Sequence, residues 1–234
     1  MTDRDQLGAL GALAEPNRRA LYEHVAAAED WVSRDQAADA VGIGRATAAH
    51  HLDRLATDGL LEVDYQRLSG RQGPGAGRPA KVYRRARADL EVSLPPRAYE
   101  LAGQLLARAA DRSRTEDLPF TSALGAVAEA EGRRLAEEVR SLLQGADGRT
   151  QATRRLAVVD VLDRHGFEPR AELDGTIVLK NCPFHRLAQE HRELICGMNH
   201  CLLHAAIEDV GRTGFAARLE PDEDACCVRL HPVP

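Results

Sequence analysis

The chain has 234 residues, a formal net charge of −5 at pH 7 and a hydrophobic content of 44%. These values describe a globular protein with one or two hydrophobic cores, and they exclude disorder and a fibrous repeat. No run of about 18 apolar residues is present, so we expect no membrane-spanning segment and no membrane partner. The N-terminal stretch is polar and amphipathic, which predicts a cytoplasmic protein without a leader peptide.

Charge and cysteine are unevenly distributed along the chain. Basic and acidic residues balance within residues 1–90, but the segment 67–87 carries basic residues and no acidic one. A local basic stripe suits contact with phosphates even in a protein that is acidic overall. All five cysteines fall within residues 182–227. Because cytoplasmic thiols stay reduced, this clustering favours metal binding or free thiols over structural disulfides.

Helical patterns fill the first 60 residues. Apolar residues at helical spacing predict a helix within 7–14, and Pro16 is placed to begin a second one, where its missing N–H is not needed. Ser33 can cap a third helix that Gly42 ends, and a fourth follows over residues 44–59. Two helices joined by a tight glycine-containing turn are typical of a helix-turn-helix. Its expected inner face consists of Ala37, Ala38, Val41, Ile43, Ala48, Leu52 and Leu55.

Beyond residue 59 the pattern changes to strands. Residues 60–68 alternate and are rich in strand-forming residues, and residues 80–86 alternate again. Between them, the glycine- and proline-rich segment SGRQGPGAGRP interrupts both patterns. We therefore expect a hairpin with a long basic tip, and a helix-turn-helix followed by a hairpin is a winged helix.

The arrangement of residues 7–88 resembles the ArsR-like winged-helix regulators, whose wing often ends in a G-R-P-x-x-x-Y phrase. Here the phrase is GRPAKVY, from Gly77 to Tyr83. The resemblance implies a transcriptional regulator that binds double-stranded DNA as a homodimer.

Several residues of this first part are candidates for DNA contact. The second helix of a helix-turn-helix enters the major groove with its N-terminal, outward residues at the base edges. Arginines in this helix suit guanine edges or phosphates, threonine suits a phosphate or a thymine methyl, and histidines suit a phosphate or a base. Arginines of the wing suit the DNA backbone or the minor groove. The predicted DNA-binding residues are Arg45, Thr47, His50, His51, Arg54, Arg71, Arg78 and Lys81.

In residues 91–234 the sequence pattern predicts a helical segment, followed by a segment of mixed helices and strands. From Leu94 to about Gly145 the sequence is rich in Ala, Leu, Arg and Glu, which predicts two long helices whose charged faces are solvated or pair subunits. Helical and strand patterns then alternate to the end of the chain. The expectation is an α+β protein in three parts. These are a winged helix-turn-helix in residues 1–90, a helical linker or dimerisation region in 91–150, and a small α+β sensor domain in 151–234.

The cysteines are expected at element boundaries. Cys182 follows a strand and precedes a helix, Cys196 lies between helical segments, and Cys226 and Cys227 open the last strand. None of these positions forms a C-x-x-C pair, so the usual zinc-finger spacing is absent. Thiolates from separate chain positions can still hold a soft ion or an iron–sulfur cluster.

The phrase NCPFHRLAQEHRELIC, followed further on by CCVRL, resembles the C-terminal domain of SufR-like regulators, which are relatives of the ArsR group. The resemblance implies an iron–sulfur cluster ligated by Cys182, Cys196 and Cys226, with zinc as the alternative metal. Strand alternation favours Cys226 over Cys227, since adjacent strand residues point to opposite faces. A fourth ligand stays open, and Cys201 is included in the predicted metal site. The candidates are Cys201, Cys227, His185, His191 and His200.

Three functions are compatible with these patterns. The first is a homodimeric transcription factor whose C-terminal domain binds a cluster, with the state of the cluster altering operator affinity. The second keeps the DNA-binding part and makes the C-terminal domain a sensor of zinc or a small molecule. The third is a cysteine hydrolase that uses Cys182 or Cys196 with a histidine. No oriented third group or oxyanion motif is recognisable in the sequence, so we do not expect an enzyme.

Overall fold

A computed structural model describes residues 3–67, 79–87, 92–144, 150–222 and 224–233. Helices and sheets are both present, in agreement with the predicted α+β class, and the chain divides into two compact units, residues 1–92 and 93–234. Within the described ranges, no helix has the length and apolar character needed to cross a membrane. The two units are considered one at a time.

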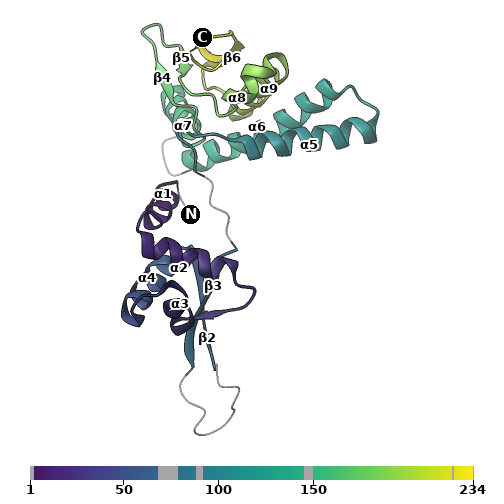
Figure 1. The fold of residues 1–234 in the computed structure, drawn as a ribbon. Coiled ribbons are helices and arrows are strands. Elements are labelled where there is room, and N and C mark those ends of the chain that lie inside the picture. Colours follow the sequence, from purple (N-terminus) through teal and green to yellow (C-terminus); the bar gives the residue numbers. More distant parts are fainter. Residues whose placement is uncertain (1–2, 68–78, 88–91, 145–149, 223, 234) are drawn as a thin grey trace. The chain divides into compact units, whose positions relative to one another are not determined.

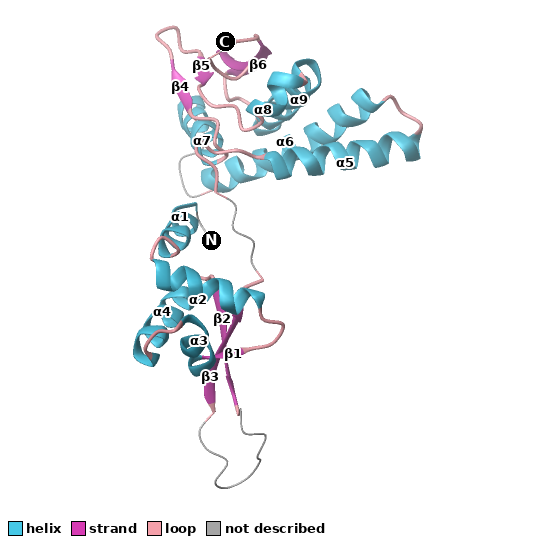
Figure 2. Cartoon of the chain, viewed as in Figure 1, coloured by secondary structure: helices cyan, strands magenta, loops and turns pink. Residues whose placement is uncertain are grey.

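The first unit combines helices with a small antiparallel sheet of order β1-β3-β2 (Figures 1 and 2). The short strand β1 was not predicted, because two residues are too few to show strand alternation. The elements are α1 Asp3–Ala12, α2 Pro16–Ala27, β1 Val32–Ser33, α3 Arg34–Val41, α4 Arg45–Thr57, β2 Leu61–Gln66 and β3 Ala80–Arg85.

Local sequence signals set the helix ends in this unit. Pro16 begins α2, and the Glu15 carboxylate accepts hydrogen bonds from two backbone N–H groups of its first turn. Ser33 and Gln36 form a reciprocal capping box at the start of α3. Gly42 ends α3 with a φ of 72°, a left-handed conformation that glycine adopts without steric cost. The turn between α3 and α4 is therefore built from local interactions.

The predicted inner face of the helix-turn-helix is confirmed. Ala37, Ala38, Ala48, Leu52 and Leu55 are buried, and Val41 and Ile43 pack partly buried against the same core. Tyr83 of β3 is also fully buried there. Since this core holds one face of α4, the opposite face of α4 is directed outward.

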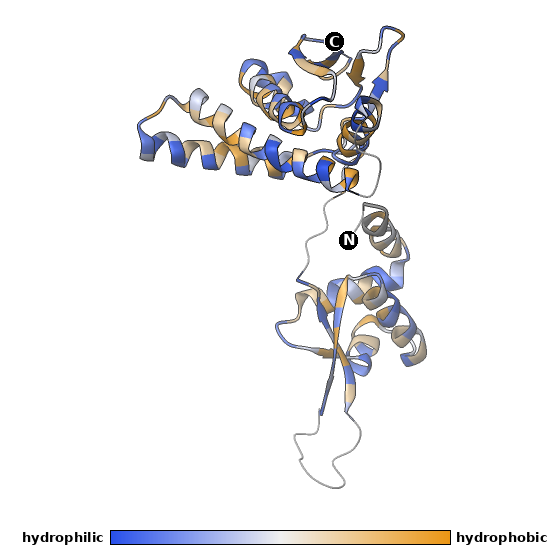
Figure 3. Ribbon diagram, turned by 180° about the vertical axis from the view of Figure 1, so that it is seen from behind, coloured by the Kyte–Doolittle hydropathy of each residue, from blue (hydrophilic) through white to orange (hydrophobic). Residues whose placement is uncertain are grey.

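The second unit contains a four-stranded antiparallel sheet of order β4-β5-β7-β6 and five helices among the described residues. The two long helices α5 and α6 run side by side (Figure 1), and hydrophilic and hydrophobic residues alternate along both (Figure 3). The elements are α5 Tyr99–Glu116, α6 Phe120–Leu143, α7 Gln151–Arg164, β4 Pro169–Ala171, β5 Ile177–Leu179, α8 His185–Glu190, α9 Arg192–Val210, β6 Phe215–Leu219 and β7 Val228–Pro232.

One hydrophobic core runs through the whole second unit. It contains Leu105 of α5, Leu135 of α6, Leu179 of β5, Leu203 of α9 and Leu230 of β7, all buried. Helix α9 packs along α6, where a methyl group at Gly132 would overlap the Leu202 carbonyl oxygen. This core contains residues from both the expected helical region, 91–150, and the expected sensor domain, 151–234. Apolar side chains of residues 91–150 and 151–234 are buried against one another.

Two predicted boundaries near the cysteines were wrong. Helix α9 is continuous through Cys196, which had been expected between helical segments. Burial of one face of α9 against α6 and β6 outweighs the low helix propensity of the central Gly197. Strand β7 begins at Val228, so Cys226 and Cys227 lie just before the strand instead of within it.

Candidate nucleic-acid interface and cysteine site

The outward face of α4 carries three of the predicted DNA-binding residues. Thr47, His50 and Arg54 follow one another at helical spacing on the face opposite the buried Leu52, and all three are exposed. Arg45 lies in the first turn of α4, and its side chain is 74% exposed. These positions match the part of a recognition helix that reaches base edges in the major groove.

Both arginines of this face have acidic partners. The Nε atom of Arg45 lies 2.6 Å from Oδ1 of Asp35, and Nε of Arg54 lies 2.9 Å from Oδ2 of Asp58. An ion pair between two exposed side chains, as for Arg45 and Asp35, contributes about 0–1 kcal/mol, because water competes for both charges. The Arg45 guanidinium can therefore exchange its carboxylate for a DNA phosphate or a base edge at little cost. The Arg54 side chain is 55% exposed, but that of its partner Asp58 is only 12% exposed.

His51 does not belong to the outward face. Its side chain is 13% exposed and turns toward the start of α2, where Nε2 lies 3.6 Å from Oε2 of Glu15. Its Nδ1 atom is buried without a hydrogen-bond partner among the described residues. His51 was predicted to contact DNA, but its side chain lies off the outward face that Thr47, His50 and Arg54 share, because one step along a helix turns a side chain by about 100°.

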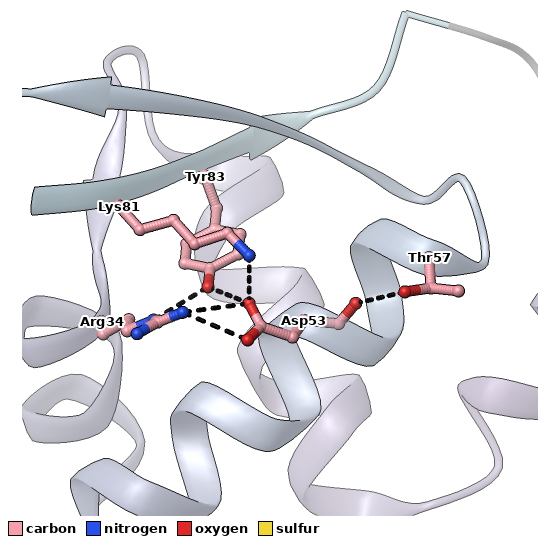
Figure 4. A network of polar contacts seen from close by, with 5 residues as sticks. All are labelled: Arg34, Asp53, Thr57, Lys81 and Tyr83. Atoms are coloured by element: carbon pink, nitrogen blue, oxygen red, sulfur yellow. Dashed lines mark hydrogen bonds and ion pairs between the residues drawn. The ribbon is translucent and has the colours of Figure 1, made fainter.

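The wing contributes Lys81, whose ammonium group is held by a carboxylate of α4. Its Nζ atom lies 2.6 Å from Oδ1 of Asp53 on α4, inside a network of polar contacts that also includes Arg34 and Tyr83 (Figure 4). The other two predicted wing residues, Arg71 and Arg78, lie outside the described residues.

The network keeps the Asp53 carboxyl ionised. Partial burial acts to raise its pKa, but hydrogen bonds from Lys81 and Tyr83 and the charge of Arg34 outweigh burial and lower the pKa below the ordinary value. Burial and the hydrogen bond to Asp53 raise the pKa of Tyr83, so its phenol stays protonated and donates to the carboxylate. Sequence analysis did not identify Asp53 or Arg34, since neither residue belongs to a recognisable motif.

In the second unit, four cysteines from three chain segments meet at one place. Cys182, Cys196 and Cys227 line a common cavity of about 240 Å³ between α8, α9 and the segment before β7. Cys226 reaches the same site from the core side, where its thiol donates a hydrogen bond to Cys182. Cys196 and Cys227 are joined by a disulfide, with their Cα atoms 6.3 Å apart. This disulfide differs from the expectation of reduced thiols.

The surroundings of Cys182 favour its thiolate form. The Cys226 thiol and the Phe184 backbone N–H donate to Cys182 Sγ and Arg97 lies nearby, so the pKa of Cys182 falls below its ordinary value despite burial. The guanidinium of Arg97 is held by the carbonyl of Cys182, at 3.1 Å, and by the side chain of Asn181. For Cys226, the hydrogen bond to Cys182 and burial both raise the pKa. Of the two sulfurs, that of Cys182 is therefore the one more readily ionised.

Asn199 is a further polar residue at this site that sequence analysis did not identify. It lies on α9 and is 1% exposed, and its Nδ2 atom donates to Cys226 Sγ at 3.2 Å. Its Oδ1 atom has no hydrogen-bond partner among the described residues. A buried asparagine next to an apolar stripe could have been noticed in the sequence, but its sulfur partner depends on the tertiary fold.

Cys201, included in the predicted metal site, lies elsewhere. It is five residues after Cys196 on α9, so it points to another side of the helix and contacts α6 at Gly125. Burial and the nearby Glu129 raise the pKa of Cys201, which disfavours a thiolate there. His200 is also directed away, with Nε2 3.2 Å from the Ala217 carbonyl oxygen, whereas His185 lines the cysteine cavity.

The donor set suits a soft metal or a cluster only when the disulfide is reduced. Across the described residues, no group of three or more His, Cys, Asp or Glu side chains is arranged to hold a metal ion. Thiolate is the ligand form of cysteine, and the sulfurs of Cys196 and Cys227 are bonded to each other. Reduction of that bond would leave three thiols lining the cavity and that of Cys226 behind them on the core side. Four cysteine sulfurs are a ligand set typical of iron–sulfur clusters and of zinc.

Comparison with known proteins concerns the first unit. A family model described as a helix-turn-helix domain matches residues 13–64, which extend from just before α2 into β2. The match supports a helix-turn-helix domain in the first unit and, with it, a role in DNA binding. No curated protein and no solved structure matches the chain.

Proposed function

We propose that this protein is a DNA-binding transcriptional regulator whose second unit binds an iron–sulfur cluster and thereby senses redox or iron–sulfur status. The convergence of Cys182, Cys196, Cys226 and Cys227 on one site is the observation that carries the sensing part. The matched helix-turn-helix domain supports the DNA-binding part.

The residues assigned to DNA are those that face outward from α4. Arg45 and Arg54 contact guanine edges or phosphates. Thr47 contacts a phosphate or a thymine methyl, and His50 contacts a phosphate or a base. In this proposal the protein acts as a homodimer, because two recognition helices read the two halves of a symmetric operator.

The residues assigned to the cluster are Cys182, Cys196 and Cys226, with Cys227 in place of Cys201 as the fourth sulfur. Cys182 is the first ligand, because its surroundings already favour the thiolate. Asn199 holds the sulfur of Cys226, and Arg97 holds the backbone of Cys182. A bound cluster would supply reversible electron transfer and sensitivity to oxidants at this position.

The disulfide favours a second candidate, in which the cysteines act as a thiol switch without a cluster. In that case reduction of the bond between Cys196 and Cys227 by a cellular dithiol yields two thiols and an oxidised reductant. The signal would then be the oxidation state of the sulfur atoms. Zinc bound by the reduced cysteines remains the alternative to a cluster.

The first experiment is to purify the full chain without oxygen and measure its absorption spectrum together with its iron, sulfide and zinc contents. Broad visible absorbance with stoichiometric iron and sulfide is expected for the wild type. Cys182→Ser should lose both, and Cys201→Ser is the matched control that should retain them, since Cys201 contacts α6.

Each alternative result has its own meaning. A colourless wild type after attempted cluster reconstitution would eliminate the cluster, and stoichiometric zinc in that sample would favour the zinc sensor. A colourless, metal-free protein whose DNA affinity changes on adding dithiothreitol would favour the thiol switch.

A further inference from the structure

A polar cavity of about 460 Å³ lies in the first unit where α3, α4 and the wing hairpin meet. We call it the wing-base cavity. Its charged and aromatic lining consists of Arg34, Asp35, Arg45, Tyr65 and Lys81. Arg45 and Lys81 were predicted to contact DNA, whereas Arg34 was not.

Two cations of this cavity are held in place by the carboxylate of Asp53 (Figure 4). Nη2 of Arg34 lies 3.2 and 3.1 Å from its two oxygens, and Nζ of Lys81 lies 2.6 Å from Oδ1. Nε of Arg34 also donates to the hydroxyl of the buried Tyr83 at 3.0 Å. The side chains of Arg34 and Lys81 are 32% and 20% exposed. They are therefore largely ordered before any ligand arrives, which reduces the entropy lost on binding.

Both cations still have donors to offer. A guanidinium has five N–H groups and an ammonium has three. Nη1 of Arg34 and the remaining protons of Lys81 have no hydrogen-bond partner among the residues that the structure describes. Donors that are charged and fixed at the wall of a cavity favour an anion with several acceptor oxygens.

The charge balance of the wing-base cavity fits a single negative charge. Arg34, Arg45 and Lys81 supply three positive charges, and Asp35 and Asp53 supply two negative ones, which leaves one positive charge unmatched. A phosphodiester group of the DNA backbone carries one negative charge and two free oxygens, so it matches both the charge and the open donors.

We infer that the wing-base cavity seats one phosphodiester of the DNA backbone, with Arg34 and Lys81 as its contacts and Asp53 as the residue that positions them. This inference rests on the DNA-binding function proposed above and adds Arg34 to the interface. Asp53 faces the protein's own cations and does not touch DNA. Its carboxylate joins α4, α3 and β3, so it sets the position of the wing base relative to the recognition helix.

The test is the salt dependence of DNA binding by the full chain. The probes are a labelled duplex that the wild type selects from a random-sequence library and a scrambled duplex of the same length, followed by fluorescence anisotropy at several KCl concentrations. Each neutralised phosphate contributes about 0.9 to the slope of log K against log salt concentration. The double variant Arg34→Gln, Lys81→Gln should lower the slope by about 0.9 on both duplexes, since both residues contact one phosphate.

Two variants serve as controls for charge and for folding. Arg84→Gln removes one positive charge, where the double variant removes two, from a side chain about as exposed as that of Arg34. Arg84 pairs with Glu62 on another side of β3, so the slope for this variant should stay close to that of the wild type. Arg34→Lys keeps the charge and should keep the slope. Trp31, the only tryptophan, lies in this unit, so its fluorescence reports whether the Arg34 and Lys81 variants are folded. Arg84 lies over the Trp31 ring at 4.5 Å, so the folding of Arg84→Gln is checked by far-UV circular dichroism instead.

Asp53 is tested separately as a positioning residue. Asp53→Asn retains both cations, so the salt slope should persist, while the preference for the selected duplex over the scrambled one should fall. Asp53→Glu should recover part of that preference. A folded Asp53→Asn variant with unchanged preference would overturn the positioning role.

The remaining outcomes separate this inference from the proposed function. An unchanged slope in the double variant would show that Arg34 and Lys81 only support the fold. A decrease of the salt slope by about 1.8 would mean that Arg34 and Lys81 contact two separate phosphates, and it would overturn the single phosphate site. A wild type that enriches no sequence from the random library and does not bind the scrambled duplex would overturn the DNA-binding function itself.

Discussion

At the scale of single residues, orientation on a helix decides which candidates can reach DNA. Thr47, His50 and Arg54 share the outward face of α4, while His51 turns inward to Glu15. Residue type and neighbourhood in the sequence are the same for His50 and His51. Only the direction of the side chain separates a contact with a ligand from a contact within the fold.

This difference predicts opposite effects of two alanine substitutions. Arg54→Ala should weaken binding to the selected duplex about ten- to hundredfold, because one specific contact to a base is worth about 1–3 kcal/mol. His51→Ala should leave DNA affinity unchanged and lower the thermal midpoint of the first unit. Anisotropy titration and Trp31 fluorescence measure the two quantities. A loss of affinity in a folded His51→Ala variant would return His51 to the interface.

The lowered pKa of Asp53 predicts a pH dependence of stability. A carboxyl whose pKa is lower in the folded than in the unfolded chain adds stability that is complete above about pH 4 and is lost as the pH falls toward the folded value. The free energy of unfolding from Trp31 fluorescence should therefore decrease below that pH, and less steeply in Asp53→Asn. Asp30→Asn, at an exposed position of the same unit, should follow the wild-type profile.

At the scale of elements, helices α6 and α9 approach each other closely at Gly132. A Cβ atom at this position would overlap the Leu202 carbonyl and come within 2.9 Å of Ala205 Cβ. Backbone atoms cannot move aside as a flexible side chain can, so this glycine fixes the spacing of the helices that carry the second core.

Gly132→Ala should therefore destabilise the second unit by about 1–3 kcal/mol, the usual cost of overpacking. The matched control is Gly125→Ala on the same helix, where a new Cβ would lie 3.7 Å from Cys201 Sγ, an ordinary contact. That substitution should be neutral or stabilising, because alanine favours the helix by about 0.8–1.0 kcal/mol over glycine. Denaturant unfolding followed by far-UV circular dichroism measures both. If Gly132→Ala and Gly125→Ala changed the free energy of unfolding equally, α6 and α9 could separate at Gly132 without cost.

At the scale of the whole molecule, two units with separate hydrophobic cores predict two unfolding transitions. Trp31 belongs to the first unit and should follow only its transition, while circular dichroism follows both. Adding the selected duplex should raise the Trp31 midpoint by mass action and leave the other one unchanged. A single transition seen by both probes would mean that the units unfold cooperatively.

The amino-acid sequence by itself determined the local features of this protein. Proline, serine and glycine at helix ends, together with helical and strand periodicity, were enough to predict the helix-turn-helix, the wing hairpin and the two long helices. These signals act over a few residues, so they can be recognised without knowing the fold. The concentration of cysteine in the last quarter of the chain was equally visible.

The tertiary structure alone decided which of these residues meet. Cys227 lies at the cysteine site, because it directly precedes β7. Cys201 does not, because it lies on the side of α9 that faces Gly125 of α6. Asp53 acquires Arg34, Lys81 and Tyr83 as partners from positions 19 to 30 residues away. Contacts over such separations depend on how whole elements pack, and packing is fixed by the burial of many side chains together, so no short motif contains it.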